Sequence, residues 1–320
     1  DLGKTVTWVP LRLIVCQHCW LVQTVDFTTR ESLFTWNYSY FSSYSTSWLE
    51  HCRQYHKEVM NSLQLDSTCK VVEVAANDGC LLQYFVESGI PCLGVEPTRT
   101  TANAARLRGI PIIEEFFGAS LARDLVGKGE SADLVIGNNV LAHVPDINDF
   151  VRGFSAILKP EGIASFEFPW LLNLISGNQF DTIYHEHYSY LSLIATKRIL
   201  EANGLHVYDV LQVPTHGGSL RVFAQRGDTG RRSESVRLRN LIEEERVAGV
   251  ETLAFYKKFQ RRAVMAKIEF LEFLVSAKKS GERVMGYGAA AKGNTLLNFA
   301  GVRSELLECV AERNPSKQGN

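Results

Sequence analysis

The stretch "TIYHEHYSYLS", residues 182–192, places two histidines, one glutamate and three tyrosines within eleven positions. These side chains accept or donate protons, or bind metal ions, near neutral pH. A metal site would use His185 and His187, which share one face if the segment is extended, but no third ligand follows at a suitable spacing. Acid–base chemistry is therefore the favoured interpretation, and an exposed polar loop is the plainer alternative.

The middle of the chain contains a β-α-β pattern that suits a nucleoside. Residues 71–74 are a short apolar run typical of a buried parallel strand, residues 75–79 form a small polar turn, and residues 81–87 have helical spacing. Residues 93–95 form a second strand that ends in Glu96. A carboxylate there can accept hydrogen bonds from both hydroxyls of a ribose bound above the strand ends.

The turn "EVAANDG" favours a cationic ligand over a dinucleotide. It lacks the G-x-G-x-x-G pattern that lets a diphosphate approach a helix N-terminus, and Glu73 and Asp78 would repel phosphate. S-adenosylmethionine (SAM) carries a ribose, an ammonium and a sulfonium but no phosphate, so we expect SAM rather than NAD. The residues expected to bind SAM are Glu73, Ala75, Asn77, Gly79 and Glu96, with Asn138 and Asn139 from the end of a later strand.

Further strands and helices complete an α/β fold. Strands are expected in "ADLVIGN" and "GIASFEFPW", and then in "LHVYDVLQV" and "SLRVFAQR", which are joined by the hairpin-length loop "PTHGG". A parallel sheet that ends in an antiparallel hairpin is the usual plan of the Rossmann-like class I SAM-dependent methyltransferases. The 182–192 stretch follows the second of these strands, so we expect it over the carboxyl edge of the sheet, where ligands bind.

Several segments together resemble the sugar C-methyltransferase family, whose members act on nucleotide-linked keto-deoxysugars. The resemblance runs from about Cys16 to the C-terminus and implies a small N-terminal zinc-binding module, a SAM domain, and a C-terminal Rossmann-like α/β domain that helps hold the nucleotide sugar. We place these parts at residues 1–47, 48–229 and 230–320. The segments are "VVEVAANDGCLL", "LGVEPT", "NNVLAHVPDINDF", "TIYHEHYSYLS", "HGGSLRV", "GYGAAAKGNTLLN" and "ERNPSKQG".

The resemblance also implies roles for particular side chains. The family's active site uses the tyrosine, glutamate and second histidine of a Y-H-E-H block, which are Tyr184, Glu186 and His187 here, and a histidine that matches His143. We expect His187 to remove a proton next to a ketone. Tyr184 and His143 would bind the resulting enolate or a sugar hydroxyl, and Glu186 would orient its neighbours. Without the resemblance, His143 would be interpreted as a turn residue.

The N-terminal segment is expected to add a catalytic tyrosine. In "FTWNYSYFSSYS" the best match to the family's tyrosine is Tyr38, with Tyr40 as the second candidate. Aromatic clusters of this kind are otherwise typical of a hydrophobic core.

A C-x-x-C knuckle, Cys16 and Cys19, precedes that segment and could bind zinc through two thiolates. A structural zinc needs four ligands, and the family uses two cysteine pairs, whereas this chain has only the second pair. A half-site without metal is therefore the alternative.

The C-terminal part carries a second glycine-rich turn. Residues 231–280 have the spacing of one or two long helices, followed by a strand, the turn "GYGAAAKG", a helix and a further strand. Small residues let a phosphate approach, and Lys292 could neutralise its charge. The resemblance assigns this turn to the diphosphate of the sugar, with His216 of "THGGS" facing the same cleft, whereas packing alone is the plainer interpretation.

Composition narrows the function classes. The formal net charge of −1 on 320 residues gives no overall attraction to nucleic acid, and no apolar run reaches the roughly 18 residues that cross a bilayer. Seven scattered cysteines are typical of reduced thiols, which indicates a cytoplasmic protein. We expect a monomer or homodimer with a nucleotide-sugar substrate. The missing initiator Met and the end just after a predicted strand are typical of a fragment.

The sequence thus predicts a SAM-dependent C-methyltransferase that acts at C-3 of a nucleotide-linked 4-keto-deoxysugar, with a histidine base and an enolate intermediate. Two alternatives stay open: SAM-dependent methyl transfer to another acceptor, and a non-catalytic nucleotide- or sugar-binding derivative of the family. The acidic turn argues against an NAD oxidoreductase.

Overall fold

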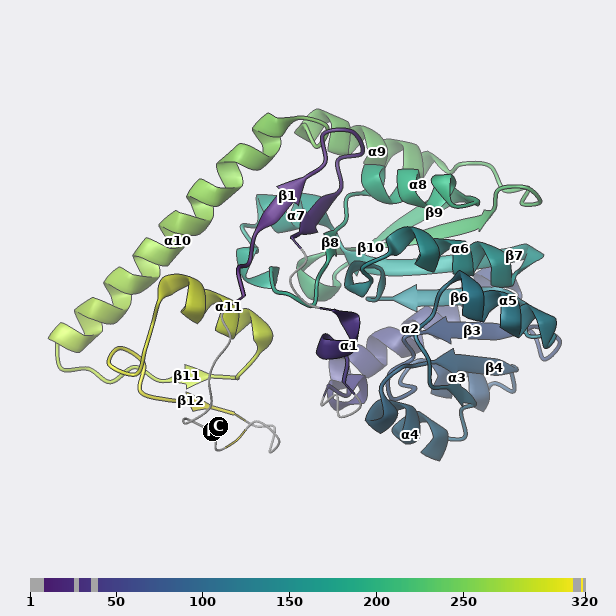
Figure 1. Cartoon of the computed structure of the whole chain (residues 1–320), viewed down its shortest axis with the longest axis horizontal. Helices are drawn as coiled ribbons and strands as arrows, with labels where there is room; N and C mark the ends of the chain where they lie inside the picture. The colour runs from purple at the N-terminus through teal and green to yellow at the C-terminus, as the bar shows by residue number, and fades with distance from the viewer. Residues whose placement is uncertain (1–8, 26–28, 36–39, 313–317, 319–320) are drawn as a thin grey trace.

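A seven-stranded sheet forms the centre of the chain (Figure 1). The computed structural model describes residues 9–25, 29–35, 40–312 and 318. The strands lie in the order β5-β4-β3-β6-β7-β10-β9. Their bounds are β3 Val71–Val74, β4 Cys92–Val95, β5 Ile112–Ile113, β6 Ala132–Asn138, β7 Leu158–Pro169, β9 Leu205–Val213 and β10 Ser219–Arg226.

The direction of these strands matches the expectation from the sequence. Neighbouring strands from β5 to β7 run parallel, and β10 runs antiparallel to both β7 and β9. The predicted parallel sheet with an antiparallel hairpin at its end is confirmed. The chain therefore has the Rossmann-like α/β fold of class I SAM-dependent methyltransferases.

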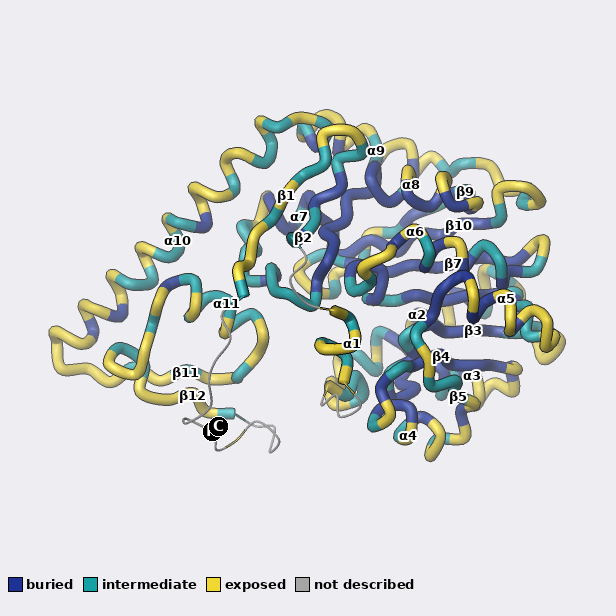
Figure 2. Tube along the Cα trace, in the orientation of Figure 1, coloured by how far each residue is buried: buried dark blue, intermediate teal, exposed yellow. Residues whose placement is uncertain are grey.

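Helices cover both faces of the sheet, so alternate strand residues enter different cores. Val71 packs in the cluster formed with α2, α3 and α4, whereas Val72 packs in the cluster formed with α5, α6 and α8. Figure 2 shows that the buried backbone is concentrated in these layers. The helices are α2 Thr46–Leu63, α3 Leu82–Glu87, α4 Arg99–Leu107, α5 Ala119–Gly127, α6 Ile147–Ile157 and α8 Leu193–Ala202.

A small second sheet connects the N-terminal segment to the stretch of residues 182–192. The knuckle of Cys16 and Cys19 lies between β1 and β2, which pair antiparallel, and β2 also pairs with β8 through Val22 and Tyr190. As predicted, the stretch lies between β7 and α8. The elements here are β1 Leu13–Val15, β2 Val22–Thr24, α1 Arg30–Leu33, η1 Ser42–Tyr44, η2 Leu141–His143, α7 Leu171–Ser176, η3 Phe180–Thr182, β8 Ser189–Tyr190 and η4 Thr215–Gly217.

The C-terminal part is a β-α-β unit that two helices connect to the sheet. Helix α9 (Val236–Ala248) packs beside β9, and α10 (Leu253–Lys279) leads away from the sheet (Figure 1). Strands β11 (Gly286–Tyr287) and β12 (Val310–Ala311) pair in parallel around α11 (Ala291–Ala300), as the sequence predicted. Among the helices in the described part of the chain, none combines the length and apolar character of a membrane span.

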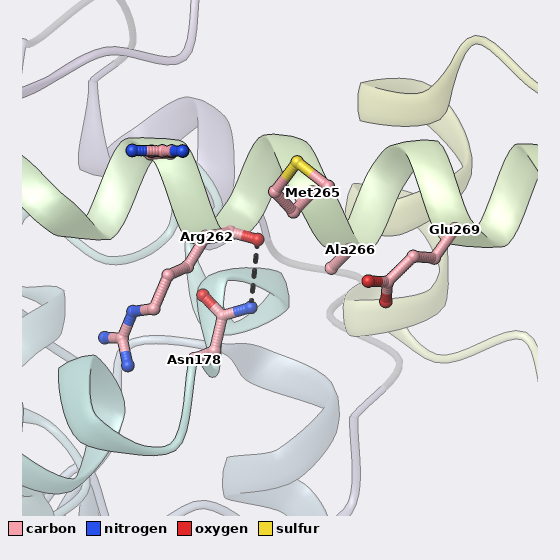
Figure 3. Close-up of a pocket in the computed structure, with 6 residues that line it drawn as sticks. Asn178, Arg262, Met265, Ala266 and Glu269 are labelled. Atoms are coloured by element: carbon pink, nitrogen blue, oxygen red, sulfur yellow. Dashed lines mark hydrogen bonds between the residues drawn. The ribbon is translucent and has the colours of Figure 1, made fainter.

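A cavity of about 310 Å³ lies against α10 and the turn after α7 (Figure 3). Asn178 Nδ2 donates to the backbone oxygen of Arg262 at 3.3 Å, and Arg262 Nη1 donates to the Ser176 carbonyl at 3.2 Å. None of the residues predicted to do chemistry lines this cavity. Its lining is Asn178, Arg261, Arg262, Met265, Ala266 and Glu269.

Candidate active site

The turn after β3 needs an unusual backbone. Ala75, Asn77 and Gly79 have φ values of 59°, 49° and 76°, in the left-handed region. At Gly79 a Cβ atom would lie 2.3 Å from Cδ1 of Ile110, so only glycine fits without displacing the core. The turn therefore brings backbone groups and small side chains to the carboxyl edge of the sheet.

Two predicted acids lie buried at this turn. Burial, followed by the charges of Cys80, Asp78 and Glu96, raises the pKa of Glu73 well above its usual value, and its Oε2 has no hydrogen-bond partner among the described residues. Glu96 Oε2 accepts from the Asn77 amide at 2.9 Å, and Oε1 accepts from the Thr98 amide at 2.9 Å. Glu96 thus holds the turn against the end of β4, while Glu73 faces a cavity.

That cavity contains part of the predicted SAM site. Its volume is about 30 Å³, roughly the share of one water molecule in the liquid. Gly79, Glu96 and Asn139 do not line it, and the Asn139 amide donates to the Glu167 carbonyl at 2.6 Å. The lining residues are Ser42, Trp48, Cys52, Glu73, Ala75, Ala76, Asn77, Cys80, Leu81 and Asn138.

Residues 40–44 cover the cavity. The Ser42 amide donates to Asn77 Oδ1 at 2.9 Å, and Asn77 Nδ2 donates to the Tyr40 carbonyl at 3.1 Å. The Ser43 hydroxyl and amide both donate to Asp78 Oδ2. A ligand the size of SAM requires these contacts to open, because pockets for such ligands measure about 300–1,000 Å³.

The stretch of residues 182–192 meets the segment after β6 in a ring cluster formed by His143, Tyr184 and His187. The His187 ring lies 4.7 Å from that of His143 and 4.2 Å from that of Tyr184. His187 Nδ1 lies 3.1 Å from the carbonyl oxygen of Thr182. Because a carbonyl only accepts, Nδ1 carries the hydrogen, which leaves Nε2 of His187 with a lone pair.

Both imidazoles are neutral at physiological pH. Burial, together with the charge of His143, holds the pKa of His187 well below its usual value. Burial also lowers the pKa of His143 to about 4, and its Nδ1 has no hydrogen-bond partner among the described residues. Burial, the charge of Glu186 and the neighbouring Tyr40 raise the pKa of Tyr184, so its phenol stays protonated. The cluster therefore combines a possible proton acceptor with a hydrogen-bond donor.

The two histidines of the H-E-H sequence point to different places. His185 Nε2 donates to the Pro10 carbonyl at 3.2 Å, in the N-terminal segment, whereas His187 is buried among the rings. The metal interpretation of this stretch has no support, since the described residues contain no group of three or more His, Cys, Asp or Glu side chains that could hold an ion. Tyr38 lies outside the described residues.

The C-terminal unit contacts the segment that carries the ring cluster. The positive charge of Lys292, at the start of α11, contributes to the lowered pKa of both His187 and His216. His216 lies in η4 with a φ of 53°, and its ring is 5.4 Å from that of Trp48. Thr295 of α11 donates to the Ile183 carbonyl at 3.1 Å.

Comparison with known proteins assigns the family. The chain is 33% identical over 313 residues to C-methyltransferase NovU from Streptomyces niveus, and the match covers 98% of this chain and 74% of that protein. The chain belongs to the SAM-dependent C-methyltransferase family. Its predicted enzyme class is therefore confirmed.

Two family models also match the chain, and more distant relatives share part of it. Residues 47–210 match the family described as "Methyltransferase domain", and residues 214–320 match the "C-methyltransferase C-terminal domain". The ubiquinone biosynthesis O-methyltransferase of Bartonella tribocorum is 21% identical over 173 residues, which cover 51% of this chain and 70% of that protein. The solved structure of the PH0226 protein from Pyrococcus horikoshii OT3 superposes with a TM-score of 0.48 at 14% identity, covering 63% of this chain and 100% of that one.

The predicted zinc module of this C-methyltransferase is not shown. Backbone amides of Cys19 and His18, in that order, lower the pKa of Cys16, as in a knuckle that could hold a metal. The two thiols supply half of the four donors that a structural zinc requires, and no further metal ligand joins them in the described ranges. The described residues alone therefore do not complete a zinc site.

Sequence reasoning missed one polar pair in the C-methyltransferase site, His51 and Glu167. His51 Nε2 and Glu167 Oε1 are 2.7 Å apart, and the Glu167 side chain is fully buried in β7. A signal was present, because Glu167 is an acid inside the otherwise apolar strand "GIASFEFPW". Its partner lies on α2, far away in the sequence, and no local pattern indicates that contact.

Proposed function

We propose that this C-methyltransferase transfers a methyl group from SAM to C-3 of a nucleotide-linked 4-keto-deoxysugar through an enolate. The observation that carries the proposal is the ring cluster of His143, Tyr184 and the buried His187, in which Nε2 of His187 is available as a base. Such a cluster suits proton removal next to a ketone, because a neutral imidazole accepts the proton and a phenol donates to the oxygen.

The proposed chemical roles are those that the family resemblance implies, and the hydrogen bond at Nδ1 of His187 supports one of them. His187 Nε2 removes the proton from the carbon next to the ketone, and the electron pair of that C–H bond forms the enolate. Tyr184 and His143 contact the enolate oxygen or a neighbouring hydroxyl, and Glu186 orients them. Tyr38, which the resemblance implies as a catalytic tyrosine, is proposed as a further catalytic residue. The enolate carbon then takes the methyl group from the sulfonium, whose sulfur keeps the S–CH₃ bonding pair.

The proposed SAM site is the turn after β3. Buried acceptors without a partner in the described structure, Glu73 Oε2 and Asn138 Oδ1, favour a ligand that carries a positive charge. The turn residues Ala75, Asn77 and Gly79 would approach the nucleoside, and Glu96 and Asn139 border them. When bound, SAM supplies the electrophilic methyl group.

The proposed sugar-nucleotide site lies between the ring cluster and α11. Lys292 brings a positive charge near His187 and His216, which supports binding of a diphosphate there. On this view residues 230–320 contribute to the acceptor site, residues 48–229 bind SAM, and residues 1–47 cap the bound substrate.

Incubation with a TDP-4-keto-6-deoxysugar and isotope-labelled SAM tests this function. We expect mass spectrometry to find one labelled methyl group at C-3 of the product. His187→Ala should abolish transfer while calorimetry shows SAM binding retained, and the matched variant His185→Ala should stay active. Unchanged turnover in His187→Ala would exclude the proposed base. SAM binding by an inactive wild type would instead point to another acceptor.

A further inference from the structure

Strand β2 brings a threonine hydroxyl to the backbone of the proposed base. Thr24 Oγ1 donates to the His187 carbonyl at 2.5 Å, and the Thr24 amide donates to the Tyr188 carbonyl at 3.0 Å. Thr24 is only 7% exposed, although 163 positions of sequence separate it from His187. One residue of the N-terminal segment therefore holds two successive carbonyl groups at the proposed base.

The hydroxyl is the unexpected part of this contact. Val22, two residues earlier, is buried on the same side of β2 and packs in an apolar cluster with Leu171 and Tyr190. Valine has nearly the shape of threonine and suits a strand at least as well. A buried hydroxyl lowers stability unless it forms a hydrogen bond, so the bond to His187, rather than packing, accounts for a threonine at position 24.

The peptide group that Thr24 holds also contacts the segment of the second histidine. Its oxygen belongs to His187 and its N–H belongs to Tyr188. That N–H donates to the Ala142 carbonyl at 2.8 Å, and Ala142 immediately precedes His143 in η2. This single peptide group therefore lies between β2 and η2, next to two imidazole rings that are 4.7 Å apart.

Further hydrogen bonds within the stretch fix the His187 ring relative to its own backbone. The His187 amide donates to the Tyr184 carbonyl at 3.0 Å, and Nδ1 donates to the Thr182 carbonyl at 3.1 Å. With these bonds made, the position of Nε2 follows the position of the His187 main chain. A displaced His187 carbonyl would move the Cα atom and carry the ring with it, so Thr24 acts on Nε2 through the backbone.

We propose that Thr24 is a positioning residue for methyl transfer, whose hydroxyl holds the imidazole of His187 at its place beside that of His143 by fixing the His187 carbonyl. This inference rests on the proposed function, because it concerns the base of that reaction. Thr24 keeps its own proton throughout and touches no reacting atom. A purely structural role, in which the hydroxyl only stabilises the small sheet, predicts different results in the following experiment.

The experiment compares three variants with the wild type. Thr24→Val keeps the shape of the side chain but removes the donor, and Thr24→Ser restores the donor. Thr196→Val is the matched control, because Thr196 is also buried and its Oγ1 donates to the Ser192 carbonyl at 2.7 Å rather than to a residue of the ring cluster. Each protein is incubated with the TDP-4-keto-6-deoxysugar and S-adenosylhomocysteine in D₂O. Exchange at C-3, the kinetics of methyl transfer with SAM, and Tm are then measured.

We expect Thr24→Val to lower the exchange rate and kcat about 10–100-fold with KM within a few-fold, because a small misplacement of a catalytic group has effects of this size. Thr24→Ser should recover most of the rate. Thr196→Val should lower Tm, since it too removes a buried hydrogen bond, but should keep kcat. A wild-type kcat in Thr24→Val overturns the inference, as do equal losses of kcat in Thr24→Val and either of the other variants.

A measurement that needs no substrate keeps the two proposals separate. NMR of the imidazole groups should show the His187 resonances shifted in Thr24→Val but unchanged in Thr24→Ser and Thr196→Val. Unshifted His187 resonances in Thr24→Val overturn the inference even if this sugar is not a substrate. A wild type that neither exchanges nor methylates the sugar refutes the proposed function instead.

A further variant covers the case in which Thr24→Val does not fold. Thr24→Cys keeps a side chain of similar size, but its thiol is a weaker hydrogen-bond donor than a hydroxyl. Its kcat should fall clearly below that of Thr24→Ser at comparable KM. Equal kcat values in the Cys and Ser variants would then overturn the inference.

Discussion

The imidazole rings of His143 and His187 lie 4.7 Å apart with their planes at 75°, one at the end of η2 and the other just before β8. Burial lowers the pKa of both, so the pair is neutral above mildly acidic pH. Because the rings are so close, protonating both would place two positive charges side by side, which costs free energy. This relationship links the proposed base to the stability of the folded chain.

Acid should weaken the fold through these histidines. In the unfolded chain they take up protons near pH 6.5, whereas folded His143 does so only near pH 4. The free energy of unfolding should therefore decrease as pH falls from about 6.5 to 4, by up to about 1.4 kcal/mol per pH unit for each imidazole. Urea titrations across this range measure the slope. His143→Asn should make it shallower, and an unchanged slope would contradict the assignment.

Gly79→Ala should damage the SAM turn more than an ordinary glycine substitution does. Its φ is +76° and the new methyl would lie 2.3 Å from Cδ1 of Ile110. Gly89→Ala is the matched control, since its φ is +71° but no atom lies within 4 Å of the added Cβ. We expect Gly89→Ala to cost about 1 kcal/mol and Gly79→Ala about 1–3 kcal/mol more. Equal unfolding free energies would show that Ile110 moves aside freely.

Ser43→Ala should ease entry of SAM. This change removes the hydroxyl that bonds Asp78 and accepts from Arg108 Nη2 at 2.9 Å, so the cover over the cavity loosens. Ser42→Ala is the control, because Ser42 bonds Asn77 through its backbone amide. Stopped-flow fluorescence of Trp48 should give a several-fold faster association for Ser43→Ala alone. Identical rates in the three proteins would mean that residues 40–44 do not limit binding.

Lys292→Met should weaken binding of the sugar nucleotide and shift the pH dependence of catalysis. Loss of the diphosphate contact should raise KM, and loss of a nearby positive charge should raise the pKa of His187. The acidic limb of the kcat profile should then move to higher pH. Lys257→Met, at an exposed position of α10, is the control. A wild-type KM and pH profile in Lys292→Met would contradict the proposal that α11 forms part of the acceptor site.

Local patterns in the sequence determined most of the elements. Apolar runs marked β3, β4 and β7, and the small polar turn with Glu96 marked a nucleoside site, because strand period and turn chemistry depend on neighbouring residues. The H-E-H stretch and His143 were also singled out, and the structure brings His143, Tyr184 and His187 together. Their roles stay predictions.

Tertiary structure alone decided which distant groups meet. The pairing of β2 with β8, the cover of residues 40–44 over the SAM turn, and the bond between His51 and Glu167 join segments that are remote in sequence. The sequence also did not indicate where the two histidine side chains point. His185 hydrogen-bonds the Pro10 carbonyl, whereas His187 hydrogen-bonds the Thr182 carbonyl within the ring cluster. Composition and the spacing of apolar residues specify which face of a helix or strand is buried. Which other segment packs against that face depends on how the layers of the fold come together.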